Sequence, residues 1–255
     1  QKYDEFHSNI FEPLKPLQPT DAPVTRCYNL NLIIKELAPD GYMRPVWTIN
    51  GQYPGPIIQA NYGDRLLINV TNNLGEPTSI HWHGIEQRGS NLYDGPPGMV
   101  QCPIPNDYSL LYNFTVNQTG TYWYHSHTAG QLIDGLKGPL IIFDPKDPHH
   151  NKYDFEYVIT ISDWYHNTSD TMISMILAHG FKGVDPMPDS GEISGKGQYN
   201  CSTVPKGSKC NPNNGIATYK IKRGKKYRFR IISISSAAHI IFSIDEHPLT
   251  IIEVD

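Results

Sequence analysis

The sequence has few charged residues, few cysteines and no long apolar segment, and these absences exclude several classes of protein. Asp, Glu, Lys and Arg make up only 18% of the 255 residues, and the formal net charge is −4. The scattered Lys and Arg form no basic stripe of the kind that nucleic-acid-binding domains present. No run approaches the ~18 consecutive apolar residues that a membrane-spanning helix needs. The hydrophobic content of 38% is nevertheless sufficient for a core, which argues against a disordered chain.

Turn-forming residues and tyrosine are abundant instead. The chain contains 21 Gly, 21 Pro and 16 Tyr. Short strands separated by many turns have this composition, so it predicts an all-β fold. The length suits one large domain or two domains of ordinary size.

Strand patterns divide the chain into an arm and two units. Residues 1–23 are rich in proline and predict an extended N-terminal arm. In residues 24–145, strand patterns at spacings near ten residues indicate a sandwich or barrel with Greek-key connections. The strands predicted there are Val24–Leu37, Arg65–Thr71, Leu110–Val116, Thr121–His127 and Pro139–Phe143.

A second strand series follows the linker-like residues 144–151 and makes up a second unit, residues 146–255. Its predicted strands are Phe155–Ser162, Ala217–Lys222, Tyr227–Ser233, Ile240–Ile244 and Leu249–Val254. Met172–Leu177 is a candidate short helix, and Asp185–Asn214 is a long Gly/Pro/Ser-rich segment with two of the four cysteines. The apolar pattern of Leu249–Asp255 has no partner strand after it, and folded proteins avoid such exposed edges. We therefore expect the chain to be a piece of a longer polypeptide.

Glycosylation sequences favour a secreted protein. The 18 Asn and 31 Ser or Thr in 255 residues predict about two Asn-x-Ser/Thr sequences by chance. Five occur, and no signal peptide begins at Gln1, so we expect a mature, cleaved and glycosylated chain whose cysteines form disulfides. The alternative is buried free thiols with chance sequences. The five candidate sites are Asn69, Asn113, Asn117, Asn167 and Asn200.

Two segments carry histidines in a strand pattern. SIHWHG (Ser79–Gly84) and TYWYHSHT (Thr121–Thr128) each place two His at positions i and i+2. Side chains alternate between the faces of a strand, so both imidazoles of a pair share one face, and Trp82 and Ser126 lie on the other. Four neutral nitrogen ligands on strands suit copper or zinc. The alternative is four ordinary core or surface histidines, but burying them without a ligand would leave polar nitrogens to satisfy.

With these motifs the sequence resembles the blue multicopper oxidases, which include laccases, ascorbate oxidase and the Fet-type ferroxidases. HWHG and HSH resemble the first two of that family's four copper-binding motifs, and the resemblance extends from about Val24 to the end of the chain. It implies tandem cupredoxin-like Greek-key β-barrels, of which the second is incomplete and a third domain is absent from this chain. Its further segments are NGQYPGP (Asn50–Pro56), GIEQRGSNLYDGPPGMVQCPI (Gly84–Ile104), GLKGPLIIFDP (Gly135–Pro145), SDWYH (Ser162–His166) and RFRIISISSAAHIIFSIDEHPLTIIEVD (Arg228–Asp255).

The resemblance implies a copper ligand at each motif histidine. His81 would bind type 2 copper, and His83, His125 and His127 would bind the type 3 coppers of a trinuclear cluster. An acid in the DGPPG loop serves the family as a proton relay, which implies that role for Asp94. Reduction of O₂ to two waters takes four electrons and four protons, so a carboxylate near the cluster has a clear task. The alternative for Asp94 is an ordinary turn residue.

The family's third and fourth motifs, similar to HPxHLHGH and HCH, do not occur in the sequence. They would supply the other cluster histidines and the type 1 copper site, where electrons enter. We therefore expect residues 1–255 to provide half of a trinuclear copper site and to be inactive alone. The expected partners are O₂, a small reducing substrate and the missing C-terminal part of the same enzyme.

The resemblance also bears on the cysteines. Cys102, in VQCPI, resembles a family cysteine bridged to one near the far C-terminus, which this chain lacks. Cys27 is expected to bridge to the Asp185–Asn214 segment, with Cys210 as its partner. Cys201 then has no assignment.

The reducing substrate is less well defined. In Fet-type ferroxidases an acid in a G-acid-P-x-P segment helps bind Fe(II), and Asp185 occupies that place in GVDPMP, although it equally fits a turn. Many basidiomycete laccases have a Cys followed by a phenol-docking acid where this sequence has Ser236-Ala237, and GKGQYNC (Gly195–Cys201) resembles ascorbate oxidase. We expect a laccase-like oxidase of phenols, with ferroxidase and ascorbate oxidase as alternatives.

Two further alternatives belong to other classes. A non-catalytic cupredoxin-type secreted glycoprotein would be expected to lose ligand histidines, yet all four available ones are present. A zinc hydrolase would need a carboxylate base near an open site, and neither histidine motif has an adjacent Glu.

Overall fold

The computed structural model describes residues 3–254 except residues 5, 7, 8, 19 and 21, and it consists mainly of three β-sheets. Their strand orders are β2-β1-β4-β6, β3-β8-β7-β5 and β10-β9-β11. The predicted all-β class is thus confirmed. Among the described residues, no helix has the length and apolar character needed to cross a bilayer. The strands are β1 (Thr25–Leu37), β2 (Arg44–Ile49), β3 (Ile58–Asn61), β4 (Arg65–Asn73), β5 (Ile80–His83), β6 (Ser109–Thr115), β7 (Gly120–Ser126), β8 (Lys137–Phe143), β9 (Phe155–Trp164), β10 (Ser190–Ile193) and β11 (Tyr227–Ser233), and the helices are α1 (Gln131–Asp134) and α2 (Ser169–Ile176).

The two four-stranded sheets share one hydrophobic core. On β4, every second residue is buried, so that Leu66, Ile68 and Val70 point inward with no exposed surface. Tyr124 of β7 and Leu140 of β8 enter the same core from the other sheet. The two sheets do not join into a closed ladder, so the predicted barrel takes the form of two facing open sheets.

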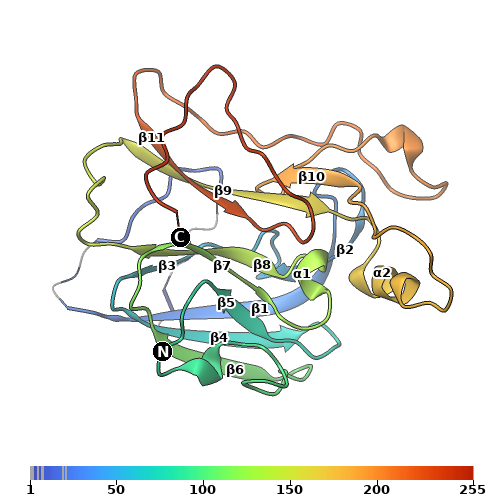
Figure 1. Cartoon of the computed structure of the whole chain (residues 1–255), viewed down its shortest axis with the longest axis horizontal. Coiled ribbons are helices and arrows are strands. Elements are labelled where there is room, and N and C mark those ends of the chain that lie inside the picture. The colour runs from blue at the N-terminus through green and yellow to red at the C-terminus, as the bar shows by residue number, and fades with distance from the viewer. Residues whose placement is uncertain (1–2, 5, 7–8, 19, 21, 255) are drawn as a thin grey trace.

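The sheet that contains β8 lies between the first sheet and the β10-β9-β11 sheet, as the layers in Figure 1 show. All seven residues of β8 are buried. Leu140 and Ile142 belong to the first core, whereas Ile141 and Phe143 face the second unit. Burial on both faces explains why this strand is almost continuously apolar. The second core consists of Leu14, Ile57, Ile141, Phe143, Val158, Ile232 and Ile234.

Most of the predicted strands are confirmed to within a few residues, and the candidate helix corresponds to α2. The Asp185–Asn214 segment is not wholly loop, because it contains β10. The short strands β2 and β3 had not been predicted. They are strands because of their partners: β2 pairs with β1, and β3 pairs with β8.

Three predicted strands are wrong: Ala217–Lys222, Ile240–Ile244 and Leu249–Val254 form no strand. Ile241 is 98% exposed and Ile251 is 80% exposed. Alternating apolar residues become a strand only when a neighbouring strand accepts their hydrogen bonds, and within the described residues none pairs with these segments. Asp255 lies outside the described residues.

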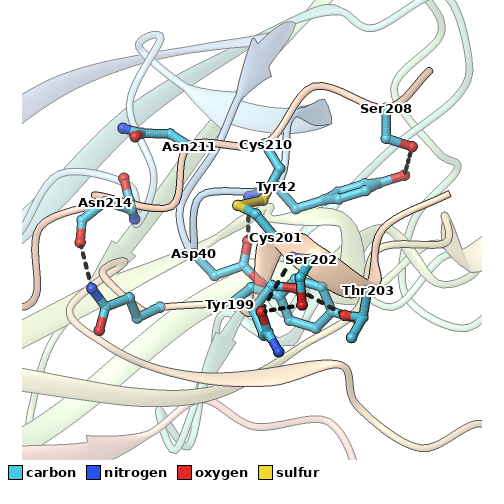
Figure 2. Close-up of a disulfide and its surroundings, with 12 residues drawn as sticks. Asp40, Tyr42, Tyr199, Cys201, Ser202, Thr203, Ser208, Cys210, Asn211 and Asn214 are labelled. Carbon is cyan, nitrogen blue, oxygen red and sulfur yellow. Dashed lines mark hydrogen bonds between the residues drawn. A yellow bond between two sulfur atoms is a disulfide. The ribbon is translucent and has the colours of Figure 1, made fainter. Parts of the chain in front are cut away.

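The predicted Cys27–Cys210 disulfide is also wrong, because Cys210 is bonded to Cys201 (Figure 2). The two Cα atoms are 5.6 Å apart and the cysteines are separated by nine positions, so closing this loop costs less chain entropy than a bridge from Cys27 to Cys210 would. Cys27 lies buried in β1, where its backbone N–H and C=O are hydrogen-bonded to Asp4. Cys102 is exposed and forms no disulfide within the described residues, so its bond to a cysteine outside this chain stays a prediction.

The disulfide loop connects the two units through residues 39–43 of the first. The N–H of Met43 donates to the carbonyl of Lys209 at 2.9 Å, and the N–H of Asn211 donates to the carbonyl of Gly41 at 2.8 Å. Gly41 has a φ of +103°, and a Cβ there would lie 2.6 Å from the Asn211 oxygen, so only glycine fits. Figure 2 shows the side chains of both loops gathered around the disulfide.

Replacing both Cys201 and Cys210 with serine is expected to lower the free energy of unfolding by about 3 kcal/mol, the effect of a disulfide that closes a loop of roughly ten residues. Denaturant titration followed by tryptophan fluorescence measures this loss. Cys102→Ser is the matched control and should leave stability unchanged. Peptide mapping under non-reducing conditions that linked Cys27 to Cys210 would contradict the assignment.

Candidate metal centre

The two histidine motifs lie side by side because β5 and β7 pair as antiparallel neighbours. In their register, His81 lies directly opposite His125. Trp82 and Tyr124, one step along each strand, are fully buried in the first core. Since strand side chains alternate, the histidines are directed to the opposite face of the sheet.

The ring nitrogens of three motif histidines converge. One nitrogen from each of His81, His83 and His125 lies within 4.8 Å of the others. Nδ1 of His83 is 3.2 Å from Nε2 of His125. The ring centroid of His127 lies 5.5 Å from that of His81 and 6.1 Å from that of His125. The fold therefore brings all four predicted histidines into one cluster, which we call the histidine cluster.

Backbone carbonyls orient two of these rings. Nδ1 of His81 is 2.7 Å from the carbonyl oxygen of Asp94, and Nδ1 of His125 is 2.8 Å from that of Ser126. A carbonyl oxygen can only accept, so we assign the proton of each neutral ring to Nδ1. Nε2 of each ring then keeps its lone pair, the arrangement that metal-binding histidines use in proteins.

Burial favours the neutral form of the imidazoles. His125 is only 6% exposed, and burial lowers its pKa to about 3 against a hydrogen bond to Ser126 that acts in the opposite direction. Burial and the neighbouring rings of His81 and His127 also lower the pKa of His83. A metal binds only the neutral imidazole, so the lowered pKa values keep these rings in the form that binds a cation. Its donors are imidazole nitrogens, and they fit copper.

Asp94 lies at the edge of the histidine cluster. Its carboxylate Oδ1 is 3.3 Å from Nδ1 of His81, and its side chain is 29% exposed. The next residue, Gly95, has a φ of +105° and packs directly against the carbonyl of Ile80, where a Cβ would clash. This close approach holds the Asp94 loop against β5.

Asp185 is not part of the histidine cluster. It is exposed on the segment between α2 and β10. Two residues at the cluster had not been predicted. The ring of Trp123 packs on His83 and His125 at centroid distances of 4.8 and 4.3 Å, and its place two residues before His125 could have indicated this face. Gln131, which is hydrogen-bonded to Thr78 just before the first motif and to Ser126 in the second, has no signal in the sequence.

Family models described as multicopper oxidase match residues 33–147 and residues 155–255. The chain belongs to the multicopper oxidase family.

Relatives in this multicopper oxidase family include fungal laccases. Laccase-2 of Thanatephorus cucumeris is 43% identical over 241 residues, which cover 89% of this chain and 38% of the relative. Laccase-1 of Cryptococcus neoformans is 39% identical over 255 residues, which cover 97% of this chain and 40% of the relative. The chain therefore spans about two-fifths of the length of these relatives.

Solved multicopper oxidase structures share the fold. The laccase from Botrytis aclada is 40% identical with a TM-score of 0.76, over 85% of this chain and 39% of that protein. Fet3p, described as a multicopper oxidase that functions in iron import, is 40% identical with a TM-score of 0.62, over 68% of this chain and 33% of that protein.

In the metal-free protein, the free energy of unfolding is expected to fall by a few kcal/mol as the pH is lowered from 6.5 toward 3. The folded-state pKa of His125, about 3, lies below the ordinary value of 6.5. In this window the unfolded chain binds a proton that the folded chain excludes, so stability is present above pH 6.5 and is lost on acidification.

Denaturant titrations across this pH range measure the effect. His125→Gln should flatten the pH dependence, because glutamine does not titrate. His247→Gln, at an exposed position, is the control and should keep the parent slope. Equal slopes for His125→Gln and the parent would contradict the assigned pKa.

Proposed function

We propose that residues 1–255 are the N-terminal part of a laccase-like multicopper oxidase, which couples one-electron oxidation of phenols to four-electron reduction of O₂ to water. The observation that carries this proposal is the convergence of ring nitrogens from both motifs. The chain that carries them is about 40% identical to fungal laccases, which supports phenols as the substrate class.

Each residue of the histidine cluster has a proposed role. His81 would hold type 2 copper, and His83, His125 and His127 would hold type 3 copper. Copper held there would supply the one-electron redox chemistry that reduction of dioxygen requires. The carboxylate of Asp94, beside His81 and partly exposed, would hold a proton at Oδ1 and pass protons from solvent toward the cluster.

We propose cupredoxin-like units at residues 24–145 and 146–255, preceded by the arm of residues 1–23. Because the relatives are more than twice as long as the region matched, the other cluster ligands and the type 1 copper site would come from sequence outside residues 1–255. These residues alone would then be inactive. The proposed partners are O₂, a small reducing substrate and that further part of the enzyme.

We also propose that the protein is secreted and glycosylated. The disulfide between Cys201 and Cys210 supports an oxidising compartment. Among the candidate glycosylation sites, Asn117, Asn167 and Asn200 are exposed, and they are the preferred sites. Asn69 on β4 and Asn113 on β6, the remaining two candidates, are half-buried.

In the complete enzyme, His83→Ala or His127→Ala is expected to abolish O₂ reduction, because each removes a proposed type 3 ligand. The intense blue absorption should remain, because the type 1 ligands would lie elsewhere. An oxygen electrode and a visible spectrum measure the two properties. His247→Ala serves as the control and should reduce O₂ normally. Retained O₂ consumption in either cluster variant would refute the ligand assignment.

Ferroxidase activity is the second candidate function, because an acid lies exposed at Asp185 and the chain is similar to Fet3p. For a laccase-like enzyme, Asp185→Ala should leave kcat/KM for phenols and for Fe(II) changed equally or not at all. A ferroxidase would lose Fe(II) oxidation selectively, because the carboxylate would bind Fe(II). Asp170→Ala, at an exposed position of α2, is the control.

A further inference from the structure

Gln131 joins the two histidine motifs through a buried hydrogen-bond network. Its Oε1 accepts from Oγ1 of Thr78 and from Oγ of Ser126, both at 2.7 Å. Its Nε2 donates to the carbonyl of Pro77 at 3.0 Å. Thr78 has no exposed surface, and Ser126 and Gln131 are each 3% exposed. One side chain thus holds the segment just before the first motif and the middle of the second.

His127 depends most on this network. β7 ends at Ser126, so the strand ladder does not include His127. The N–H of His127 donates to the carbonyl of Ser79 at 3.4 Å, which is a long hydrogen bond. The following N–H, that of Thr128, donates to the Ser126 hydroxyl at 3.2 Å. The Ser126 hydroxyl therefore connects Gln131 to the backbone on which His127 is carried.

The other three motif histidines have independent support. His81 and His83 lie within β5, and His125 lies within β7. Carbonyl oxygens also orient the rings of His81 and His125. Loss of the network should therefore affect His127 first.

The network leaves little freedom to rearrange. Both hydroxyl donors reach the same oxygen of Gln131, and removing it would leave two buried hydroxyls with reduced hydrogen bonding. The Thr78 and Ser126 hydroxyls are 3.4 Å apart, so each would have the other as an acceptor only at that long distance, although Ser126 could still accept from the N–H of Thr128. Replacing Gln131 by an apolar side chain should thus move or loosen Ser126.

We propose that Gln131 is a positioning residue for the copper cluster, which acts by holding His127 within reach of the other three rings. The part of this inference that concerns copper rests on the proposed function. Residues that do not bind the metal but orient its ligands are important for affinity: their mutation typically weakens metal binding by about 10–100-fold.

Amide hydrogen exchange in the metal-free protein tests the positioning role without copper. Gln131→Met keeps the side-chain length and removes all three hydrogen bonds. Exchange at the His127 and Thr128 amides should accelerate by about tenfold, the effect of losing one hydrogen bond. Exchange at His81 and His125 should not change. Unchanged exchange at His127 and Thr128, or a uniform increase throughout the chain, would overturn the proposal.

Two further variants keep this test decisive if Gln131→Met does not fold. Ser126→Ala removes the link between Gln131 and Thr128, so it should reproduce the faster exchange at His127 and Thr128. Gln198→Met, at an exposed position, is the matched control and should behave as the parent. A Ser126→Ala variant with parent-like exchange would reject the network.

Competition between the protein and a chelator for Cu(II) tests the effect on the metal. Introduced into the otherwise unchanged protein, Gln131→Met should weaken Cu(II) binding by about 10–100-fold. The same change should have little effect in a His127→Ala background and should keep its effect in a His83→Ala background, because it acts through His127. If Gln131→Met weakened Cu(II) binding as much in the His127→Ala background as in the parent, the proposal would be contradicted. A parent protein that binds no Cu(II) would refute the proposed function, whereas the exchange measurements would still decide the role of Gln131.

Discussion

The pairing of β5 with β7 is the constraint on which the histidine cluster depends. Burial of Trp82 and Tyr124 in the first core determines which face each strand turns outward. A slip of one residue in either strand would bury imidazoles and expose those aromatic rings, so the core specifies the register strongly. The hydrophobic core thereby places His81 opposite His125.

The same sheet face also joins the two units of the chain. Lys137 is the ladder partner of His125 on the other side of β7. Its ammonium donates to the Ser162 hydroxyl at 2.7 Å and to the carbonyl of Ile234 at 3.0 Å, both in the second unit. The histidine cluster therefore lies next to a buried contact between the units, and the disulfide loop fixes a second contact at residues 39–43.

The site could be predicted from the sequence because its geometry follows from a short-range rule. Two histidines at i and i+2 in a strand share a face whatever the rest of the fold, and HWHG and HSH both satisfy this rule. That Leu249–Val254 forms no strand could not be predicted from its apolar pattern, because a strand depends on hydrogen bonds to a partner elsewhere in the chain. The role of Gln131 and the Cys201–Cys210 bond also depend on tertiary proximity, which no local pattern reports.

Anomalous diffraction at the copper absorption edge, from crystals soaked with Cu(II), tests the central claim that both motifs form one copper site. Anomalous density is expected between the rings of His81, His83 and His125, where their nitrogens converge. Copper bound only at exposed histidines such as His150, or density at one motif without the other, would contradict it.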